Sequence, residues 1–422
     1  MEFVSDFGFR ASDFIKMLRI LFTGGGTGGH IYPIIAVSEE LQKLAFEKKI
    51  EMDLRYFGSP GMFGRLLEEN GVKVSKIFSA KLRRYFDLRN FLDIPILLPL
   101  SIIQAFWKVF WFMPDVLFSK GGPGSLPMVL ACKFYCVPII IHDSDSIIGL
   151  ANQIAVRFAD RIAVSFNAAI NFLLEKYPKK REKLAGKITL VGNPIRRSLI
   201  SAEILEQATA KKIFGFNPEK PVILVIGGSQ GAVKINDFML EIVEDLIKDY
   251  QVLHQTGVKN FEDFKNELNL ILRNHPDEEK ARYKIFAYFE KDLKDAYLAA
   301  DIVVCRGSSG SIFEAAAFGK PSILIPLPSD VVGDHQITNA YEYAKTGAAI
   351  VIEQPNLEPN IFLSQLKKLF TEPSNSTKLS LLGKPETLNQ MSEAAKKFSK
   401  PEAARILAEE ILKLASPVTQ LS

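Results

Sequence analysis

The chain has 422 residues, of which 47% are hydrophobic and 24% are charged, and its formal net charge is +4. This composition excludes an intrinsically disordered protein, and the small net charge gives no global reason to expect a nucleic-acid partner. A chain of this length exceeds one ordinary hydrophobic core, so we expect two domains.

The three cysteines predict a reducing environment and no disulfide framework. Cys132 and Cys136 have a C-x3-C spacing without a nearby pair of histidines, which argues against a zinc site. Cys305 stands alone. We expect thiols in the core or on helix faces, and no metal.

The first sixteen residues lack the basic start, apolar centre and cleavage site of a signal peptide. Regular structure is predicted to begin at Met17. Residues 1–16 are therefore interpreted as a short extension, or as the product of an upstream start codon, without a chemical role.

The first half alternates apolar strands with amphipathic helices. A strand at Leu18–Phe22 is followed by a turn at Thr23–Gly29 and a helix at Pro33–Glu47. Further strands are predicted at Met52–Gly58, Pro114–Phe118 and Pro138–His142. This alternation is typical of a parallel sheet with helices on both faces.

The same pattern begins again after a boundary near Asn193. The apolar strand Pro221–Ile226 runs into a second glycine-rich turn at Gly227–Ala232. Ala403–Leu414 is an amphipathic helix near the C-terminus. More strands are predicted at Tyr250–Gln255, Tyr283–Phe286, Ile302–Cys305, Ser322–Ile325 and Ala349–Ile352.

The most hydrophobic segment is Phe91–Met113. A membrane-spanning helix needs about 20 nearly uninterrupted apolar residues, but this segment is interrupted by Asp93, Pro95, Pro99, Gln104 and Lys108. Two interpretations stay open: a buried helix, or a surface helix that enters one face of a bilayer. The second has basic neighbours at Lys81, Arg83, Arg84, Arg89 and Lys108.

The turn Thr23–His30 follows a strand and opens a helix, a position where glycines and free N–H groups attract anions. It satisfies G-x-G-x-x-G, so with Asp53 in the next strand a dinucleotide-dependent oxidoreductase is one alternative. Three features argue against it. Asp53 falls near the start of its strand, His30 ends the turn, and the second half carries its own glycine turn. Two such turns suggest a site for a diphosphate.

Two polar clusters also follow strands, at His142–Ser146 and at Arg306–Ser311, and the second leads into a helix that carries Glu314. Ligands of open α/β sheets bind beyond the carboxyl ends of the strands. Asp143-Ser144-Asp145 also matches a metal-binding D-x-D pattern, but three residues are a weak signal. We favour hydrogen-bonding roles for these carboxylates.

The chain resembles the MurG family of peptidoglycan glycosyltransferases from Leu18 to about Leu414. The resemblance is carried by these motifs: Gly25–His30, His142–Asn152, Gly192–Arg196, Gly227–Ala232, Cys305–Glu314 and Asp334–Ala340. It implies an α/β fold of two Rossmann-like domains with a deep interdomain cleft, the GT-B architecture. The implied parts are an acceptor domain at 17–193, a UDP-sugar domain at 194–397, and a helix at 398–422 returning to the first domain.

The resemblance also implies the reaction. An inverting enzyme would move N-acetylglucosamine from UDP-N-acetylglucosamine to the 4-hydroxyl of undecaprenyl-linked lipid I, making lipid II. No cofactor and no metal would be needed. The protein would lie peripherally on the cytoplasmic face of the cell membrane.

Residue roles follow from the same resemblance. His30 and Asp143 would be catalytic, and His30 would either accept a proton or bind the acceptor diphosphate. Acceptor binding is implied for His30, Asp143, Asp145 and Asn152. Donor binding is implied for Thr27, Gly28, Gly29, Arg196, Ser229, Gln230, Phe289, Glu314, His335 and Gln336.

Two departures from the family pattern bear on the acceptor side. Asp143 stands where many members have glutamate, and Pro123 replaces the aromatic residue that often follows Gly121-Gly122. The rival functions are a related glycosyltransferase with a diacylglycerol acceptor, a UDP-sugar epimerase, and the NAD-dependent oxidoreductase.

Overall fold

The computed structural model describes residues 17–78, 97–122, 124–200, 205–228, 231–289, 292–370 and 388–415. The chain divides into two compact units. The first comprises Met1–Asp143, Gly149–Ala163 and Ala404–Ser422, and the second comprises Ser144–Ile148 and Val164–Ala403.

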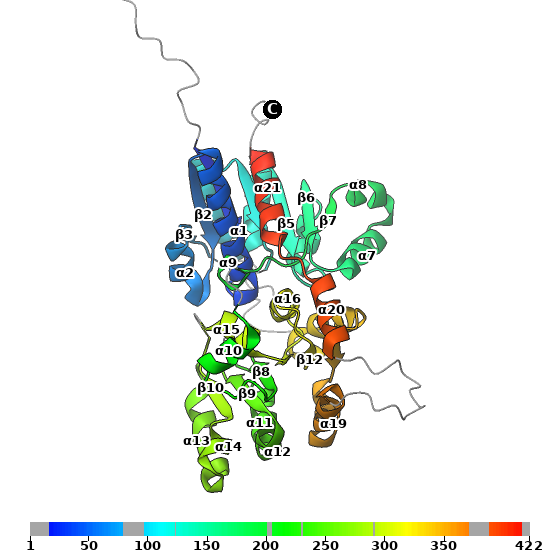
Figure 1. Ribbon diagram of the computed structural model, residues 1–422. Helices are drawn as coiled ribbons and strands as arrows, with labels where there is room; N and C mark the ends of the chain where they lie inside the picture. The colour runs from blue at the N-terminus through cyan, green and yellow to red at the C-terminus, as the bar shows by residue number, and fades with distance from the viewer. Residues whose placement is uncertain are drawn as a thin grey trace, which may run out of the picture. The chain divides into compact units, whose positions relative to one another are not determined.

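The first sheet has seven strands in the order β3-β2-β1-β4-β5-β6-β7 (Figure 1). Its strands are β1 (Leu18–Thr23), β2 (Met52–Gly58), β3 (Lys73–Lys76), β4 (Val116–Ser119), β5 (Ile139–Asp143), β6 (Arg161–Val164) and β7 (Ile188–Leu190). β1 pairs in parallel with both β2 and β4. The strand order reverses between β1 and β4, and in such sheets ligands bind at this switch point.

The second sheet repeats the arrangement with six strands, in the order β10-β9-β8-β11-β12-β13. Its strands are β8 (Val222–Ile226), β9 (Gln251–Gln255), β10 (Tyr283–Phe286), β11 (Ile302–Cys305), β12 (Ser322–Leu324) and β13 (Ala349–Val351). β8 pairs in parallel with β9 and β11, so its switch point lies between β8 and β11. The predicted two Rossmann-like sheets are confirmed.

Helices cover both faces of the second sheet, which explains why β8 is apolar throughout. Val222, Leu224 and Ile226 face one core cluster, whereas Ile223 and Val225 face the other. The first cluster includes side chains of α15 (Leu293–Ala299) and α16 (Ser309–Ala317), and the second includes those of α11 (Val233–Glu241) and α13 (Phe261–Ile271). A strand buried on both faces cannot alternate apolar and polar residues.

The remaining helices of this part of the chain are mostly short. They are α7 (Asn167–Lys176), α8 (Arg181–Ala185), α9 (Arg197–Ile200), α10 (Gln207–Ile213), α12 (Val243–Asp249), α14 (Asp277–Lys280), α17 (Ser329–Val332), α18 (His335–Ala344), α19 (Pro359–Phe370) and α20 (Leu388–Phe398).

The first unit contains α1 (Gly28–Lys48), α2 (Gly64–Glu69), α4 (Leu98–Phe112), α5 (Ser125–Phe134) and α6 (Leu150–Ala155). The C-terminal helix α21 (Ala403–Ala415), red in Figure 1, is tied to β6 by an ion pair of 2.7 Å between Arg161 and Glu410. The predicted strands are found with bounds shifted by at most two residues. β3, β6 and β7 were not predicted; β3 (Lys73–Lys76) and β7 (Ile188–Leu190) have no fully buried residue, so neither presents the apolar run of a central strand.

The helix predicted at Pro33–Glu47 begins five residues earlier, at Gly28. Glycine is a weak helix former, so the sequence pattern placed these residues in the turn. The first turn of α1 is therefore Gly28-Gly29-His30, and the His30 N–H donates to the carbonyl of the N-cap Thr27 over 3.0 Å. His30 is thus a helical residue.

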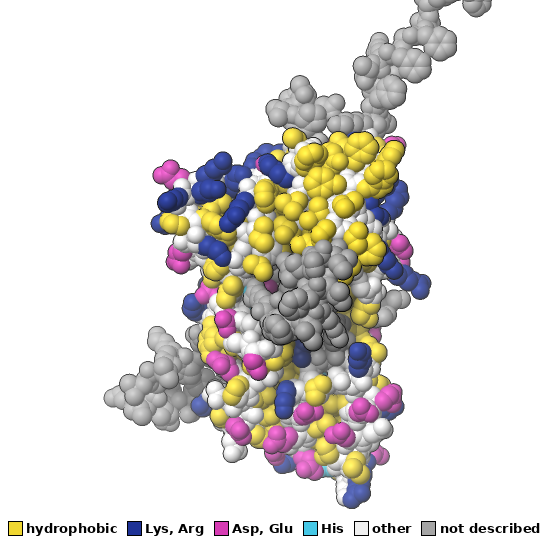
Figure 2. Space-filling model, turned by 180° about the vertical axis from the view of Figure 1, so that it is seen from behind, with side chains coloured by type: hydrophobic (Ala, Val, Ile, Leu, Met, Phe, Trp, Pro, Cys, Tyr) yellow, Lys and Arg dark blue, Asp and Glu magenta, His cyan; other side chains and the backbone are white. Residues whose placement is uncertain are grey.

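Helix α4 accounts for the described part of the hydrophobic segment Phe91–Met113; residues 91–96 lie outside the described ranges. Its buried face consists of Ser101, Ala105, Val109 and Phe112. The opposite face is exposed and apolar, with Trp107 64% and Trp111 68% exposed, and it also carries Leu100, Ile103 and Phe110. Figure 2 shows hydrophobic side chains gathered over one area of the surface. A buried helix is therefore the wrong interpretation for this face.

Within the described ranges, no helix combines the length and the apolar character that crossing a membrane requires.

A buried polar network ties β9 to its neighbours in the second unit. His254 is fully buried, with Nδ1 2.8 Å from the Tyr283 hydroxyl and Nε2 3.2 Å from Asn236 Oδ1. The Asn236 amide donates its hydrogen to Thr256 O, so its oxygen faces the imidazole. The ring is therefore neutral, with the hydrogen on Nε2, and burial lowers the pKa of His254 to about 3.

This pKa predicts that acid destabilises the fold. Because the unfolded chain binds a proton near pH 6.5 and the folded chain does not, stability falls as pH drops from about 6.5 towards 3. The expected slope from His254 is about 1.4 kcal/mol per pH unit. Urea unfolding between pH 7.5 and 5 should show this slope in the wild type and a shallower one in His254→Gln.

His275 provides a matched control for this measurement. Hydrogen bonds to Glu279 and Glu244 raise its pKa, so its contribution to stability has the opposite sign. A His275→Gln variant that flattened the acid slope as His254→Gln does would contradict the assignment to His254.

Candidate functional site

Both switch points carry a glycine-rich turn and a basic residue. In the first sheet, Gly24–Thr27 follow β1, and Lys120-Gly121-Gly122 follow β4. In the second sheet, Gly227-Gly228 follow β8, and Arg306-Gly307 follow β11. Arg306 Nε is buried without a hydrogen-bond partner in the part of the chain that the structure describes. Each unit thus places glycine backbone and a basic residue at the strand ends, where phosphates bind in folds of this kind.

His30 is oriented by the residue that precedes its helix. Thr27 is the N-cap of α1, but its side chain caps no backbone group. Its hydroxyl instead lies 2.8 Å from His30 Nδ1. If Nδ1 carries the hydrogen and donates it to Thr27, Nε2 is a proton acceptor. If Thr27 donates, Nε2 carries the hydrogen and can bind a phosphate oxygen.

The glycine turn after β4 packs against the same ring. Gly122 has φ of +83°, and a Cβ there would lie 2.9 Å from His30 Nε2. Only glycine combines this backbone conformation with so close an approach. His30 Nε2 therefore faces the turn that ends β4.

The predicted acceptor cluster is divided between the units. Asp143 Oδ2 accepts hydrogen bonds from Gly149 N at 3.0 Å and Asn152 Nδ2 at 2.9 Å, all within the first unit. Asp145, which belongs to the second unit, accepts a bond of 2.8 Å from Asn339 Nδ2. The structure brings Asp143 and Asn152 together and places Asp145 with different partners.

A buried pair beside this cluster was not predicted from the sequence. Lys120 Nζ lies 2.7 Å from His142 Nδ1, and both side chains are buried. An ammonium group can only donate, so His142 Nδ1 accepts and Nε2 carries the hydrogen. A lysine directly after an apolar strand and before two glycines is the sequence signal that could have identified it.

Glu314 lies on α16, and its carboxylate is held by a tyrosine. Tyr297 donates its hydroxyl hydrogen to Glu314 Oε2 over 3.1 Å. Burial raises the pKa of Glu314, while Arg196 and the Tyr297 hydrogen bond oppose that shift. Arg196, predicted to approach the uracil, therefore also lies within electrostatic range of Glu314.

His335 and Gln336 open α18 and contact loops that precede it. His335 Nδ1 lies 3.1 Å from Ile147 O, and because a carbonyl only accepts, Nδ1 carries a hydrogen and donates it. Gln336 Oε1 accepts a hydrogen bond of 3.1 Å from Leu327 N, so its amide N–H groups remain as donors. Asn339, on the same helix, also accepts two bonds of 2.7 Å from Ser146.

The second glycine turn is only partly described, because Ser229 and Gln230 lie outside the described residues. Gly231 has φ of +79°, and a Cβ there would come within 2.3 Å of Thr256 O. The turn therefore needs glycine to pass close to the end of β9. The Phe289 side chain is fully buried and packs on Phe286 with ring centres 4.4 Å apart. Its N–H donates to Gln255 Oε1 over 3.0 Å, so contact with a base would fall to the Phe289 carbonyl.

The alternative function of a dinucleotide-dependent oxidoreductase, in which Asp53 would bind the ribose of NAD, is wrong. Asp53 is buried near the start of β2 and is paired with Arg55 at 2.6 Å and Lys73 at 3.1 Å. Burial alone would raise the pKa of Asp53, but hydrogen bonds from Arg55 and Lys73 lower it overall. Its carboxylate is thus used in ion pairs away from the carboxyl end of the strand.

Among the described residues, no group of three or more histidine, cysteine, aspartate or glutamate side chains is arranged to hold a metal ion. The three thiols are unpaired, with Cys132 and Cys305 buried and Cys136 exposed.

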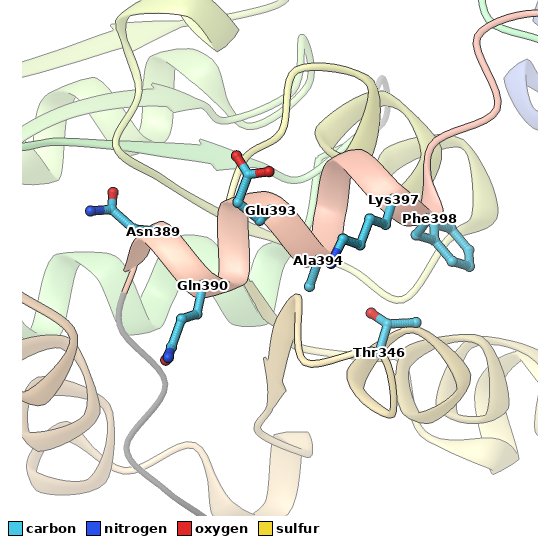
Figure 3. A pocket seen from close by; sticks show the side chains of 7 residues that line it. All are labelled: Thr346, Asn389, Gln390, Glu393, Ala394, Lys397 and Phe398. Carbon is cyan, nitrogen blue, oxygen red and sulfur yellow. The ribbon is translucent and has the colours of Figure 1, made fainter.

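A pocket of about 590 Å³ lies along α20, away from these residues. Figure 3 shows its lining: Thr346, Asn389, Gln390, Glu393, Ala394, Lys397 and Phe398. None of the predicted site residues lines it. We therefore place the functional groups at the switch points.

Comparison with known proteins shows the family of the chain. Residues 20–164 match the glycosyltransferase family 28 N-terminal domain, and residues 222–407 match the corresponding C-terminal domain. A Clostridium botulinum (strain Hall) protein named UDP-N-acetylglucosamine–N-acetylmuramyl-(pentapeptide) pyrophosphoryl-undecaprenol N-acetylglucosamine transferase is 34% identical, over 84% of this chain and 91% of its own.

This chain belongs to the MurG family. The solved structure of Acinetobacter baumannii MurG has a TM-score of 0.67 at 22% identity, covering 94% of this chain and 99% of that one. UDP-GlcNAc 2-epimerase from Neisseria meningitidis, bound to UDP-GlcNAc, has a TM-score of 0.61 at 14% identity, covering 94% and 100%. The MurG family and the epimerase share the GT-B fold, so the fold alone does not distinguish a transferase from an epimerase. The 34% identity to a protein named as a transferase does.

Proposed function

We propose that this chain transfers N-acetylglucosamine from UDP-N-acetylglucosamine to the 4-hydroxyl of the muramoyl sugar of lipid I, producing lipid II and UDP. The observation that carries this function is membership of the MurG family over most of the chain. The two anion-binding switch points suit the two diphosphates of donor and acceptor.

In the reaction, the acceptor oxygen forms a bond to the anomeric carbon as the bond from that carbon to the UDP oxygen breaks. The bonding electrons leave with UDP, and the configuration at the anomeric carbon inverts. The hydroxyl proton passes to a base, for which His30 is the candidate, and then to solvent. Asp143, fixed by Asn152 and Gly149, supports the acceptor side.

The second unit would bind the donor. The glycine turn of Gly227–Ala232, with Ser229 and Gln230, would meet the diphosphate, where oriented N–H groups stabilise the charge that builds on the leaving group. Glu314 would bind the ribose, Arg196 and the Phe289 main chain would meet the uracil, and His335 and Gln336 the sugar. Residues 17–193 and 194–397 would form the acceptor and donor domains, with 398–422 returning to the first.

The experiment that tests this function offers one labelled donor to several acceptors. UDP-N-acetylglucosamine should give labelled lipid II with lipid I, and no glycolipid with diacylglycerol. Transfer to diacylglycerol instead, or formation of a 2-epimer without any acceptor, would assign the chain to one of the rival functions.

We also propose that the protein binds the cytoplasmic face of the membrane through α4. The exposed face of Leu100, Ile103, Trp107, Phe110 and Trp111 is an apolar stripe at helical spacing. Met113 and Phe134 extend it. A soluble surface seldom exposes so many large apolar side chains together, and aromatic rings favour the interface of a bilayer. Lys108 does not contribute to this face, because it bonds to Ser75 and lies over the Phe57 ring.

Changing Trp107 or Trp111 to glutamate is expected to weaken co-sedimentation with anionic vesicles, since each change places a charge on the membrane-facing surface. Added salt should also weaken it, because the basic residues Lys81, Arg83, Arg84 and Arg89 precede the helix in the sequence. Leu270→Glu is a matched control, since Leu270 is 63% exposed on α13 of the second unit. Binding that ignores both tryptophan changes would exclude α4 as the contact.

A further inference from the structure

The carboxylate of Glu314 is fixed by a residue that no motif identifies. Tyr297 lies on α15, is fully buried, and donates its hydroxyl hydrogen to Glu314 Oε2. Glu314 itself is only partly buried. The tyrosine therefore lies on the protein side of the carboxylate and reaches it from a neighbouring helix.

The ring of Tyr297 is also held in place, by stacking. It stacks on Phe318, with ring centres 4.8 Å apart and planes inclined by 7°. Phe318 is four residues after Glu314 and is the C-cap of α16. The same helix thus supplies both the ring's stacking partner and the hydroxyl's acceptor, so the position of Tyr297 and the orientation of the Glu314 side chain are coupled.

A carboxylate that binds a ribose must offer its oxygens to two adjacent hydroxyl groups. An unrestrained glutamate would lose rotamer freedom on binding, which weakens affinity. A hydrogen bond to one oxygen removes part of this cost before the ligand arrives. It also stabilises the ionised form, which burial opposes.

We propose that Tyr297 is a positioning residue for nucleotide binding, which holds the Glu314 carboxylate in the orientation that accepts the two ribose hydroxyls of the donor. This role rests on the proposed ribose contact of Glu314. Tyr297 does not touch the donor, so its effect should depend on the ribose hydroxyls.

The test compares the binding of UDP and of 2′,3′-dideoxy-UDP by calorimetry. Tyr297→Phe keeps the stacked ring and removes the hydroxyl. It should raise the Kd for UDP by about 2- to 12-fold, the range for immobilising one side chain on binding, and leave the Kd for the dideoxy analogue unchanged. In turnover assays the KM for UDP-N-acetylglucosamine should rise with little change in kcat.

Tyr343→Phe is a matched control. Tyr343 is also fully buried in the second unit, and its hydroxyl has no hydrogen-bond partner among the residues described. It should bind both nucleotides like the wild type. Phe318→Leu, which loosens the stacked ring but keeps the hydroxyl, should give a smaller loss that again depends on the ribose hydroxyls, and it serves if Tyr297→Phe does not fold.

The outcomes separate this inference from the proposed function. If Glu314→Gln weakens UDP binding but Tyr297→Phe does not, Tyr297 has no positioning role. Equal weakening of UDP and the dideoxy analogue by Tyr297→Phe would mean a general structural effect and overturn the proposal. If Glu314→Gln leaves UDP binding intact, the ribose contact itself is wrong. In the Glu314→Gln background, Tyr297→Phe should add no further loss.

Discussion

Replacing His30 with alanine is expected to lower the turnover of lipid I by about 10²- to 10⁴-fold, the usual contribution of a general base. UDP affinity should stay nearly unchanged, because His30 lies in the first unit, whereas the residues proposed to bind the ribose and the uracil lie in the second. Steady-state kinetics at saturating lipid I, with UDP binding measured separately, would check both parts. A variant that retains most of its turnover would exclude the base role.

The contact between Thr27 and His30 allows the two roles of His30 to be distinguished. As a base, the ring needs hydrogen on Nδ1, which then donates to the Thr27 hydroxyl over 2.8 Å. Thr27→Val removes this acceptor and should therefore reduce kcat, by less than His30→Ala. If His30 binds phosphate instead, both variants should raise the KM for lipid I and leave kcat largely intact.

Glu314→Gln is expected to weaken the binding of UDP and UDP-N-acetylglucosamine alike, by about 10- to 100-fold. This range corresponds to about 1.4–2.7 kcal/mol, close to the typical contribution of hydrogen bonds to a charged group. A 2′,3′-dideoxyribose analogue should bind wild type and variant almost equally. Glu393→Gln, at a glutamate paired with Lys396 on α20, is a matched control and should not change either affinity.

The structure removes the main alternative explanation for Glu314. A glutamate in the first turn of a helix can be favoured by the helix dipole alone, but this effect fades beyond that turn. Glu314 is the sixth residue of α16, and the cap of that helix is Ser308. Unchanged UDP affinity in Glu314→Gln would therefore mean that the donor site lies elsewhere.

The acidity of Glu314 adds a pH dependence with a defined sign. Burial raises its pKa, so the carboxylate becomes protonated at a higher pH than an exposed glutamate. UDP affinity should therefore fall as pH drops through this raised pKa, since a protonated carboxyl accepts less well from the ribose. The groups that face Glu314 are Arg196, Tyr297 and Cys305, from three different segments. Glu314→Gln should not show this dependence.

The sequence by itself determined the two sheets and the glycine-rich strand ends at which we propose that ligands bind. Apolar runs such as Val222–Ile226 must be buried on both faces, and the glycine-rich turns after β1 and β8 mark the ends where helices begin. These are local signals, since each depends on a few consecutive residues. Glu314 could be predicted as a site residue from a local signal of the same kind, because its helix follows a polar cluster at the end of an apolar strand.

Only the tertiary structure decided which side chains meet. Lys120 and His142 are 22 residues apart, Asp145 and Asn339 are 194 apart, and Tyr297 reaches Glu314 from another helix. The sequence also could not predict whether the second face of α4 is buried or exposed. An apolar helix face can pack on a core or remain at the surface, and its own residues do not distinguish the two. Contacts between distant segments depend on how strands and helices pack in space, and the spacing of neighbouring residues carries no record of that packing.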